Sequence, residues 1–139
     1  RCYREVLAEF GLPFLEENVA SVKYWAQPAA AITLQLIQER EKLPDAIFCA
    51  NDLMAMGCIE ALKQLGKKIP EDVAVIGFDD IGSSIRIPYP LSSISAPKRA
   101  FARACFDLLY RRIGGDGADF PRREVFGVAL AARGSTAEI

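Results

Sequence analysis

The sequence predicts an α/β fold in which a mostly parallel sheet is flanked by helices. Short apolar runs at residues 46–49 and 73–78 have the length and composition of buried strands. Between them, at 52–65, apolar residues recur every three or four positions, which is the spacing of an amphipathic helix. Strands that alternate with helices of about 10 to 15 residues are typical of βαβ units, whose strands run parallel.

Four helices are expected from their own sequence signals. Residues 2–10 repeat apolar side chains at helical spacing, and residues 28–40 are rich in alanine, leucine and isoleucine. The helix at 52–65 follows Asn51, a residue type that caps helix N-termini well. The last helix, at 97–113, begins with a proline, which is common in a first helical turn.

The remaining apolar segments are expected to be strands. Between residues 81 and 90, two prolines and a glycine predict irregular backbone. Residues 66–72 and 114–121 are expected to form turns or loops for the same reason. The expected strands are 18–23, 45–49, 73–78, 91–96 and 124–132.

Composition and charge exclude several classes of protein. The 139 residues suffice for one domain with a core, and 51% hydrophobic with 25% charged residues is ordinary for a soluble globular protein. Seventeen basic against eighteen acidic residues give a net charge of −1, so no basic stripe predicts direct contact with nucleic acid. No apolar run approaches the roughly 20 residues of a membrane span, so no membrane partner is expected.

Metal, cofactor and catalytic sites are not expected either. Histidine is absent, and the cysteines have no CxxC spacing, so a zinc site would need thiolates from scattered elements. We expect the cysteines to be buried apolar side chains in a reducing cytoplasm. Without histidine there is no Ser-His or Cys-His pair, and no Gly-rich phosphate loop occurs. The cysteines are Cys2, Cys49, Cys58 and Cys105.

Polar residues follow two of the expected strands. Asn51 comes after the strand at 45–49, and Asp79 and Asp80 come after the strand at 73–78. In an open α/β sheet the carboxyl ends of parallel strands line the binding crevice, so Asn51 and Asp79 would recognise one polar solute. Neighbouring residues at a strand end point in opposite directions, which argues against a catalytic pair. Each residue has a structural alternative, since Asn51 suits an N-cap and Asp79 a turn.

Four strings in order carry a resemblance to a known family. They are AIFCANDLMAMG at 46–57, IPEDVAVIGFDD at 69–80, PLSSI at 90–94 with Pro97 after it, and RGST at 133–136. Together they resemble the effector-binding core of LacI/GalR transcription regulators. The resemblance implies a two-lobed core similar to periplasmic sugar-binding proteins, preceded by a helix-turn-helix headpiece that contacts operator DNA. Residues 1–139 would be the C-terminal portion of this effector-binding and dimerisation domain, without the headpiece and the N-terminal lobe.

The resemblance also implies ligand contacts at particular residues. Asn51 and Asp79 would bond effector hydroxyl groups, and Trp25 would stack on the ligand ring, at a place where a core aromatic is the alternative. Ala96 stands where many members have a glutamine, which indicates a ligand of different shape.

A two-fold dimer contact is implied on one face of the helix at 52–65. Its stripe Ala55, Cys58, Ile59, Leu62 and Leu65 would face the sheet and leave another face free. Dimerisation suits a DNA reader, because two half-sites need a two-fold protein. The expected interface residues are Met56, Glu60 and Gln64 on the helix, and Ser84 and Arg86 in the irregular stretch after it.

The sequence therefore predicts a sugar-sensing, dimerising module of a cytoplasmic LacI/GalR-type regulator, and not an enzyme. A periplasmic sugar-binding protein for ABC-type uptake has the same two-lobed fold and is the main alternative. A sugar-modifying α/β enzyme that uses Asp79 is a second alternative. Helix 97–113 would return to the N-terminal lobe, so its apolar positions would need cover from that lobe.

Overall fold

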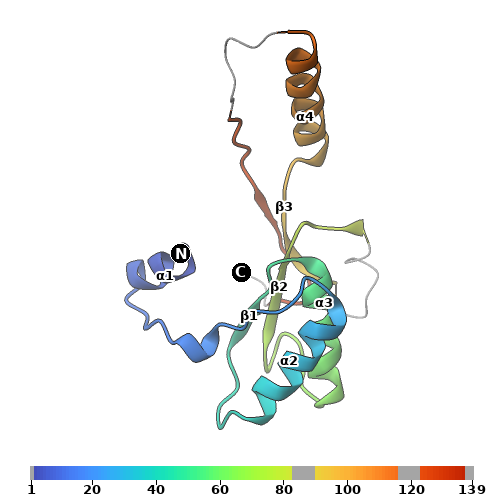
Figure 1. Ribbon diagram of the computed structural model, residues 1–139. Coiled ribbons are helices and arrows are strands. Elements are labelled where there is room, and N and C mark those ends of the chain that lie inside the picture. Colours follow the sequence, from blue (N-terminus) through green and yellow to red (C-terminus); the bar gives the residue numbers. More distant parts are fainter. Residues whose placement is uncertain (1, 83–89, 116–122, 137–139) are drawn as a thin grey trace.

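A computed structural model describes residues 2–82, 90–115 and 123–136 (Figure 1). A 3-10 helix, η1, follows the first helix. All four expected helices are present, within one or two residues of their predicted limits, which is the usual uncertainty of helix ends. The elements in chain order are α1 (Cys2–Glu9), η1 (Glu16–Asn18), α2 (Ala26–Gln38), β1 (Ala46–Phe48), α3 (Asp52–Gln64), β2 (Ala74–Phe78), β3 (Ser92–Ser95), α4 (Lys98–Ile113) and β4 (Ala129–Ala131).

The sheet is mixed and mostly parallel, as the sequence predicts. Its strands are ordered β1-β2-β3-β4. β1 pairs with β2 in parallel from Ala46 opposite Ala74, and β2 pairs with β3 in parallel from Ile76 opposite Ser92. β4 returns antiparallel beside β3. The carboxyl ends of the three parallel strands therefore lie at one edge.

The core lies between α2, α3 and the sheet, where α2 and α3 lie side by side (Figure 1). The expected stripe on α3 is confirmed, because four of its residues are at most 5% exposed and Leu65 packs against the core from its rim. Neighbouring strand residues from β2 and the start of β3 complete this core. Its largest fully buried apolar side chains are Leu62, Leu91, Val73 and Val75.

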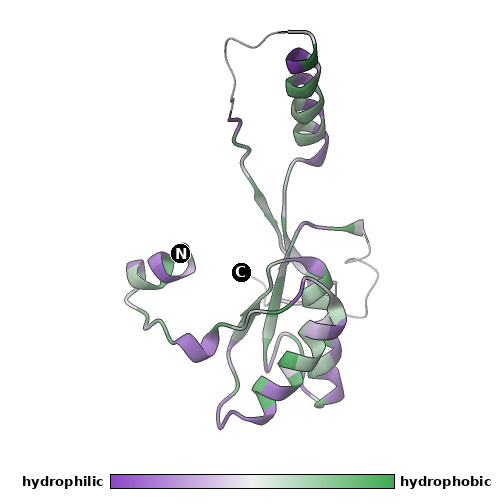
Figure 2. Cartoon of the chain, in the orientation of Figure 1, coloured by the Kyte–Doolittle hydropathy of each residue, from purple (hydrophilic) through white to green (hydrophobic). Residues whose placement is uncertain are grey.

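α4 and the segment that returns from it extend away from the sheet (Figure 1). α4 has no buried residue, and Figure 2 shows apolar positions along it. The exposed fraction reaches 76% at Ile113 and 70% at Tyr110. α4 has 16 residues. Among the described residues, no helix is both long and apolar enough to cross a membrane.

The expected strand at 18–23 is wrong. η1 ends at Asn18, and the backbone at Val19 is extended, with φ −117° and ψ 116°, but no strand is assigned between there and α2. A strand needs a hydrogen-bonded neighbour, and none is assigned here, where Val19 is exposed. The strand expected at 124–132 is shortened to Ala129–Ala131, because its partner β3 is only four residues long.

The expectation of four buried cysteines is half right. Cys49 and Cys58 are buried free thiols, whereas Cys2 and Cys105 are exposed. The two exposed thiols lie on α1 and α4, neither of which has a buried residue.

The close contact between α2 and α3 depends on Gly57. A Cβ at this position would lie 2.1 Å from the carbonyl oxygen of Ala26, and that oxygen belongs to backbone and not to a flexible side chain. We expect Gly57→Ala to lower the free energy of unfolding by about 1–3 kcal/mol, although alanine favours a helix over glycine by about 1 kcal/mol. Urea denaturation measures the change.

Gly127 is the matched control, since a Cβ there meets nothing within 4 Å. Gly127→Ala should be neutral or slightly stabilising. Equal stability of the two variants would mean that α2 moves away from α3 at little cost.

Candidate ligand-binding site

The structure brings the three predicted ligand residues to the carboxyl edge of the sheet. Asn51 follows β1 and caps α3, Asp79 follows β2, and Trp25 precedes the first turn of α2. The amide nitrogen of Asn51 lies 3.4 Å from the carbonyl oxygen of Tyr24, so the ends of α2 and α3 are adjacent. This is the geometry in which residues from separate loops can contact one ligand.

Asn51 has the capping role that its position predicts. Its Oδ1 accepts a 2.8 Å hydrogen bond from the backbone N–H of Met54. The cap occupies the oxygen of the amide, and among the described residues its nitrogen makes only the long contact with Tyr24. A ligand acceptor could therefore bind the amide group without breaking the cap, so the two roles are compatible.

Trp25 is not a core aromatic, because 66% of it is exposed. Tyr24 beside it is 67% exposed. Two neighbouring aromatic side chains thus stand open at the edge that carries Asn51. Aromatic rings of this kind offer a flat apolar face and a polar group, which suits stacking on a ring-shaped polar molecule.

Asp79 and Asp80 adopt a backbone conformation that non-glycine residues rarely have. Their φ angles are +101° and +50°. The backbone N–H of Asp79 donates to the carbonyl oxygen of Ile94 at 3.0 Å, which fixes the turn against β3. Side chains held in such conformations are more common at functional sites than elsewhere. Asp79 itself is an exposed residue.

A buried carboxylate that the sequence did not reveal organises this edge. Asp52 is 1% exposed, and its Oδ1 accepts a hydrogen bond of 2.6 Å from the Ser93 hydroxyl. Its Oδ2 accepts one of 2.8 Å from the N–H of Ile81. Ser93 in turn accepts from the N–H of Asp80 at 3.0 Å. A Cβ on Gly77 would stand 2.3 Å from Asp52 Oδ1, so the glycine inside β2 is the one sequence signal of this buried group.

Asp80 forms a second polar centre next to the first. Its Oδ1 accepts a 2.5 Å hydrogen bond from Arg133, whose guanidinium also donates to the carbonyl of Leu91. Lys98 donates to the backbone carbonyl of Asp80 at 2.8 Å. The Arg133 hydrogen bond holds the pKa of Asp80 below its usual value, although burial opposes it. A Ser95 hydrogen bond and the charges of Arg133 and Lys98 lower the pKa further. Residues from the start of α4 and from the segment after β4 therefore meet at Asp80.

The segment at 133–136, which we call the C-terminal clasp, explains the RGST string. Ser135 is fully buried; its hydroxyl donates to the carbonyl of Val75 and accepts from the N–H of Ser92. Its backbone N–H donates to Pro90, and its carbonyl accepts from Val75. The clasp thus supplies hydrogen bonds between the starts of β2 and β3, upstream of their ladder.

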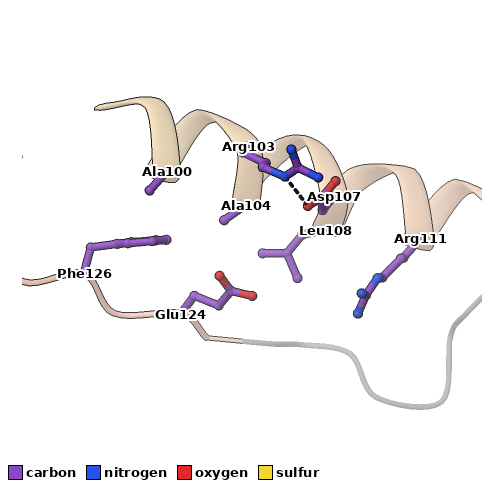
Figure 3. A pocket seen from close by; sticks show the side chains of 8 residues that line it. All are labelled: Ala100, Arg103, Ala104, Asp107, Leu108, Arg111, Glu124 and Phe126. Atoms are coloured by element: carbon purple, nitrogen blue, oxygen red, sulfur yellow. Dashed lines mark ion pairs between the residues drawn. The ribbon is translucent and has the colours of Figure 1, made fainter. Parts of the chain in front are cut away.

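A hollow of about 240 Å³ lies elsewhere, between α4 and residues 124–126 (Figure 3). Phe126 and Leu108 point into it, and Arg103 pairs with Asp107 at its rim. Its volume is below the roughly 300–1,000 Å³ of ligand pockets, and none of the predicted ligand residues lines it. Within the described residues, no group of three or more acidic, cysteine or histidine side chains is placed to hold a metal.

The expected dimer residues lie partly within the described chain. Met56 is half-buried, and Glu60 and Gln64 are exposed on the same side of α3. Ser84 and Arg86 lie outside the described residues. Their role in dimerisation stays a prediction.

The sequence matches the model of a family described as periplasmic binding protein-like domains, over residues 1–136. It is similar to the HTH-type transcriptional repressor PurR of Vibrio parahaemolyticus, with 37% identity over 111 residues that cover 80% of this chain and 33% of the repressor. PurR of Haemophilus influenzae is 45% identical over 74 residues, which cover 53% of this chain and 22% of that protein. The chain thus spans about a third or less of the length of these curated relatives.

Solved structures of LacI-family regulators have the same fold. A LacI-family regulator from Sanguibacter keddieii, described as putative in its name, has a TM-score of 0.91 at 30% identity, over 98% of this chain and 52% of its own. The regulator CelR in complex with cellobiose has a TM-score of 0.88 at 32% identity, over 96% and 40%. A LacI-family regulator from Arthrobacter sp. FB24 in complex with lactose has a TM-score of 0.82 at 29% identity, over 95% and 48%.

The ion pair of Asp80 with Arg133 gives a testable pH dependence. Because the folded-state pKa of Asp80 lies below its usual value of 3.8, the pair stabilises the fold above that value and ceases to do so as the pH falls through the folded pKa. At neutral pH we expect Asp80→Asn to cost about 1–2 kcal/mol, the contribution of a charge-assisted hydrogen bond that is mostly shielded from water. Asparagine tolerates the left-handed backbone, so strain does not confound the change.

Urea unfolding of the wild type and the variant from neutral to acid pH measures the difference, which should shrink below about pH 4. Asp107→Asn is the matched control, because Asp107 is half exposed and 3.7 Å from Arg103. It should change stability by less than about 0.5 kcal/mol. A pH-independent cost of Asp80→Asn would mean that the charge of Asp80 does not stabilise the fold.

Proposed function

Because the chain belongs to the family of periplasmic binding protein-like domains, in the form that LacI-family regulators carry, we propose that it senses a small polar effector for a transcriptional regulator. The observation that carries this proposal is the meeting of Trp25, Asn51 and Asp79 at the carboxyl edge of the parallel strands. The open aromatic ring, the amide nitrogen and the exposed carboxylate are suited to stack on and hydrogen-bond a hydroxyl-rich ring.

The effector is a sugar or a sugar derivative. CelR with cellobiose and the Arthrobacter regulator with lactose support this class, since both have the fold of this chain. Ala96 has no side-chain donor or acceptor, so any contact near the crossing from β3 to α4 comes from other residues.

The carboxyl edge of the sheet is also hydrogen-bonded to α4 and to the segment after β4, which would move when the lobes rearrange. Asp79 is next to Asp80, and Asp80 bonds Lys98 at the start of α4 and Arg133 after β4. A ligand that binds Asp79 would shift the strained turn and, with it, the hydrogen bonds of Asp80 to Lys98 and to Arg133. That linkage is the route by which effector binding favours one of two lobe arrangements, with a coupling of about 1–3 kcal/mol.

α4 and the returning segment at 123–131 form an exposed arm, which is suited to pack against the other lobe of such a core. Its large apolar side chains are exposed, and apolar patches of this kind usually mark a surface that another part of the protein covers. In the proposed whole protein, a lobe outside these residues covers them, and a helix-turn-helix headpiece binds operator DNA in the cytoplasm. The headpiece is assigned outside these residues because the net charge here is only −1. The arm's exposed apolar residues are Phe101, Phe106, Leu109, Tyr110, Ile113, Val125, Val128 and Leu130.

Regulation is favoured over sugar uptake and over catalysis because the relatives named above are transcriptional repressors and regulators. The segment that precedes these residues in the whole protein discriminates between the first two functions. A helix-turn-helix there supports regulation, whereas a secretory signal peptide would support uptake. Turnover of a sugar by the purified protein would support an enzyme.

Substitutions at the edge can separate ligand binding from helix capping. Asn51→Asp keeps a good N-cap but removes the amide donors, and Asp79→Asn keeps the shape but removes the charge. Each substitution should weaken the binding free energy of the effector by about 1.5–3 kcal/mol, the usual contribution of hydrogen bonds to charged or buried groups. Calorimetric titration of the full-length protein with cellobiose, lactose and related saccharides measures the affinity.

The stability of Asn51→Asp is the internal control, because its unfolding free energy should stay within about 0.5 kcal/mol of wild type. Full effector affinity in both variants would contradict the site. Absence of binding by the wild type to any saccharide would contradict the effector class.

A two-fold contact through α3 is the second testable part of the proposal. Met56→Asp would bury a charge near its own copy at a two-fold axis, so a dimer should dissociate to monomers. Gln38→Asp is the control, since it places the same charge on an exposed position of α2. Analytical ultracentrifugation of both variants measures the oligomeric state, and an intact Met56→Asp dimer would place the interface elsewhere.

A further inference from the structure

Two buried thiols face each other directly behind the candidate site. Cys49 directly follows the strand β1, Cys58 lies in the second turn of α3, and their sulfur atoms are 3.5 Å apart. Both residues are nearly inaccessible, at 4% and 5% exposure. A disulfide bond is about 2.05 Å long, so the two sulfurs need to approach by only about 1.5 Å to form one.

A hydroxyl group from a third element lies against the same sulfur. Thr33 of α2 has its Oγ1 3.1 Å from Cys58 Sγ and 2.7 Å from the carbonyl oxygen of Ala29. The single hydrogen of this hydroxyl serves one acceptor at a time, and it can rotate to Cys58 when that sulfur becomes charged. Cys58 therefore has two donors beside it, the Thr33 hydroxyl and the Cys49 thiol.

The two cysteines are chemically unequal for this reason. The hydrogen bond from Cys49 lowers the pKa of Cys58 against the opposing effect of burial, and the Thr33 hydrogen bond lowers it further. The pKa of Cys49 is raised, first by the hydrogen bond to Cys58, then by burial and by the negative charges of Cys58 and Asp52. Cys58 is the better thiolate and Cys49 keeps its proton, which is the division of roles between an attacking and a resolving thiol.

We propose that Cys49 and Cys58 form a site of reversible oxidation, at which hydrogen peroxide or another hydroperoxide converts the two thiols into a disulfide. The proposal rests on the placement of the sulfurs and of Thr33, and it is independent of the identity of the effector.

The chemistry is balanced with peroxide as the oxidant. The Cys58 thiolate attacks one peroxide oxygen, the O–O bond breaks, and a sulfenic acid and hydroxide form. The sulfur of Cys49 then attacks the sulfenic sulfur, an S–S bond forms, and the hydroxyl leaves as water with the Cys49 proton. The hydroxide takes up the proton that Cys58 lost on ionisation. In total two thiols lose two electrons and two protons, and one peroxide is reduced to two waters.

The disulfide would change the candidate site because of where it closes the chain. Asn51 and Asp52 lie between the two cysteines, at the turn from β1 into α3. Pulling the second turn of α3 toward the end of β1 would disturb the hydrogen bond from the Met54 N–H to Asn51, and the one from the Ile81 N–H to Asp52. These two amides are therefore reporters of the oxidised form.

The experiment uses the full-length protein with Cys2→Ser and Cys105→Ser, because those thiols are exposed and would form disulfides between molecules. After treatment with hydrogen peroxide, non-reducing peptide mapping should show a cross-link between the peptides of Cys49 and Cys58, and dithiothreitol should reverse it. Hydrogen exchange at the Met54 and Ile81 amides should be several-fold faster in the oxidised protein than in the reduced protein.

Single substitutions in the same background test the roles. Cys49→Ser should accumulate a sulfenic acid at Cys58 that dimedone traps, Cys58→Ser should leave Cys49 unreacted, and Thr33→Val should slow oxidation several-fold. Circular dichroism checks that each variant is folded. If a variant is unfolded, the peptide map of the protein that keeps both Cys49 and Cys58 decides the test.

Two outcomes would overturn the proposal. One is the recovery of both thiols after peroxide treatment, as alkylated cysteines in the unfolded protein. The other is oxidation of Cys58 to a sulfinic acid without any cross-link to Cys49. Unchanged exchange at the two amides in a fully oxidised sample would overturn its structural part.

Discussion

The candidate site depends on one buried carboxylate, that of Asp52. It receives the hydroxyl of Ser93 and the backbone N–H of Ile81, so it joins the start of α3, the strand β3 and the turn after β2. A buried charge is stable only when its hydrogen bonds are made, and here a first-turn position on the helix adds a favourable dipole. Loss of either partner would leave a charged acceptor unsatisfied, at a cost of about 1–3 kcal/mol or more. The position of Asp79 follows from this anchor, because Ile81 fixes the end of the turn that carries it.

The turn itself holds strain that the anchor and Asp80 offset. Two consecutive aspartates with positive φ persist because their N–H groups are bonded to Ile94 and Ser93 and because Arg133 holds the Asp80 carboxylate. These partners belong to β3 and to the segment after β4, and Asp79 itself is exposed.

Sequence patterns predicted the helices and the parallel strands because these depend on local periodicity and on buried apolar runs. They failed at 18–23, since an apolar pattern does not specify whether a neighbouring strand is there to pair with it. They placed Asn51, Asp79 and Trp25 at one edge through topology and resemblance, and correctly read Asn51 as an N-cap. The contacts that organise the edge escaped prediction because they join distant positions. Asp80 and Arg133 are 53 residues apart, and Asp52 and Ser93 are 41 apart.

The C-terminal clasp has a consequence for the order in which the chain folds during synthesis. The backbone N–H groups of Val75 and Ser92 donate to Ser135, which the ribosome adds 43 residues after Ser92. Until then the starts of two sheet strands are incompletely paired, and open strand edges are where nascent chains associate wrongly. Folding of this sheet is therefore tied to the synthesis of residues 133–136, and a polypeptide that ends before Arg133 would lack the hydrogen bonds that join the starts of β2 and β3.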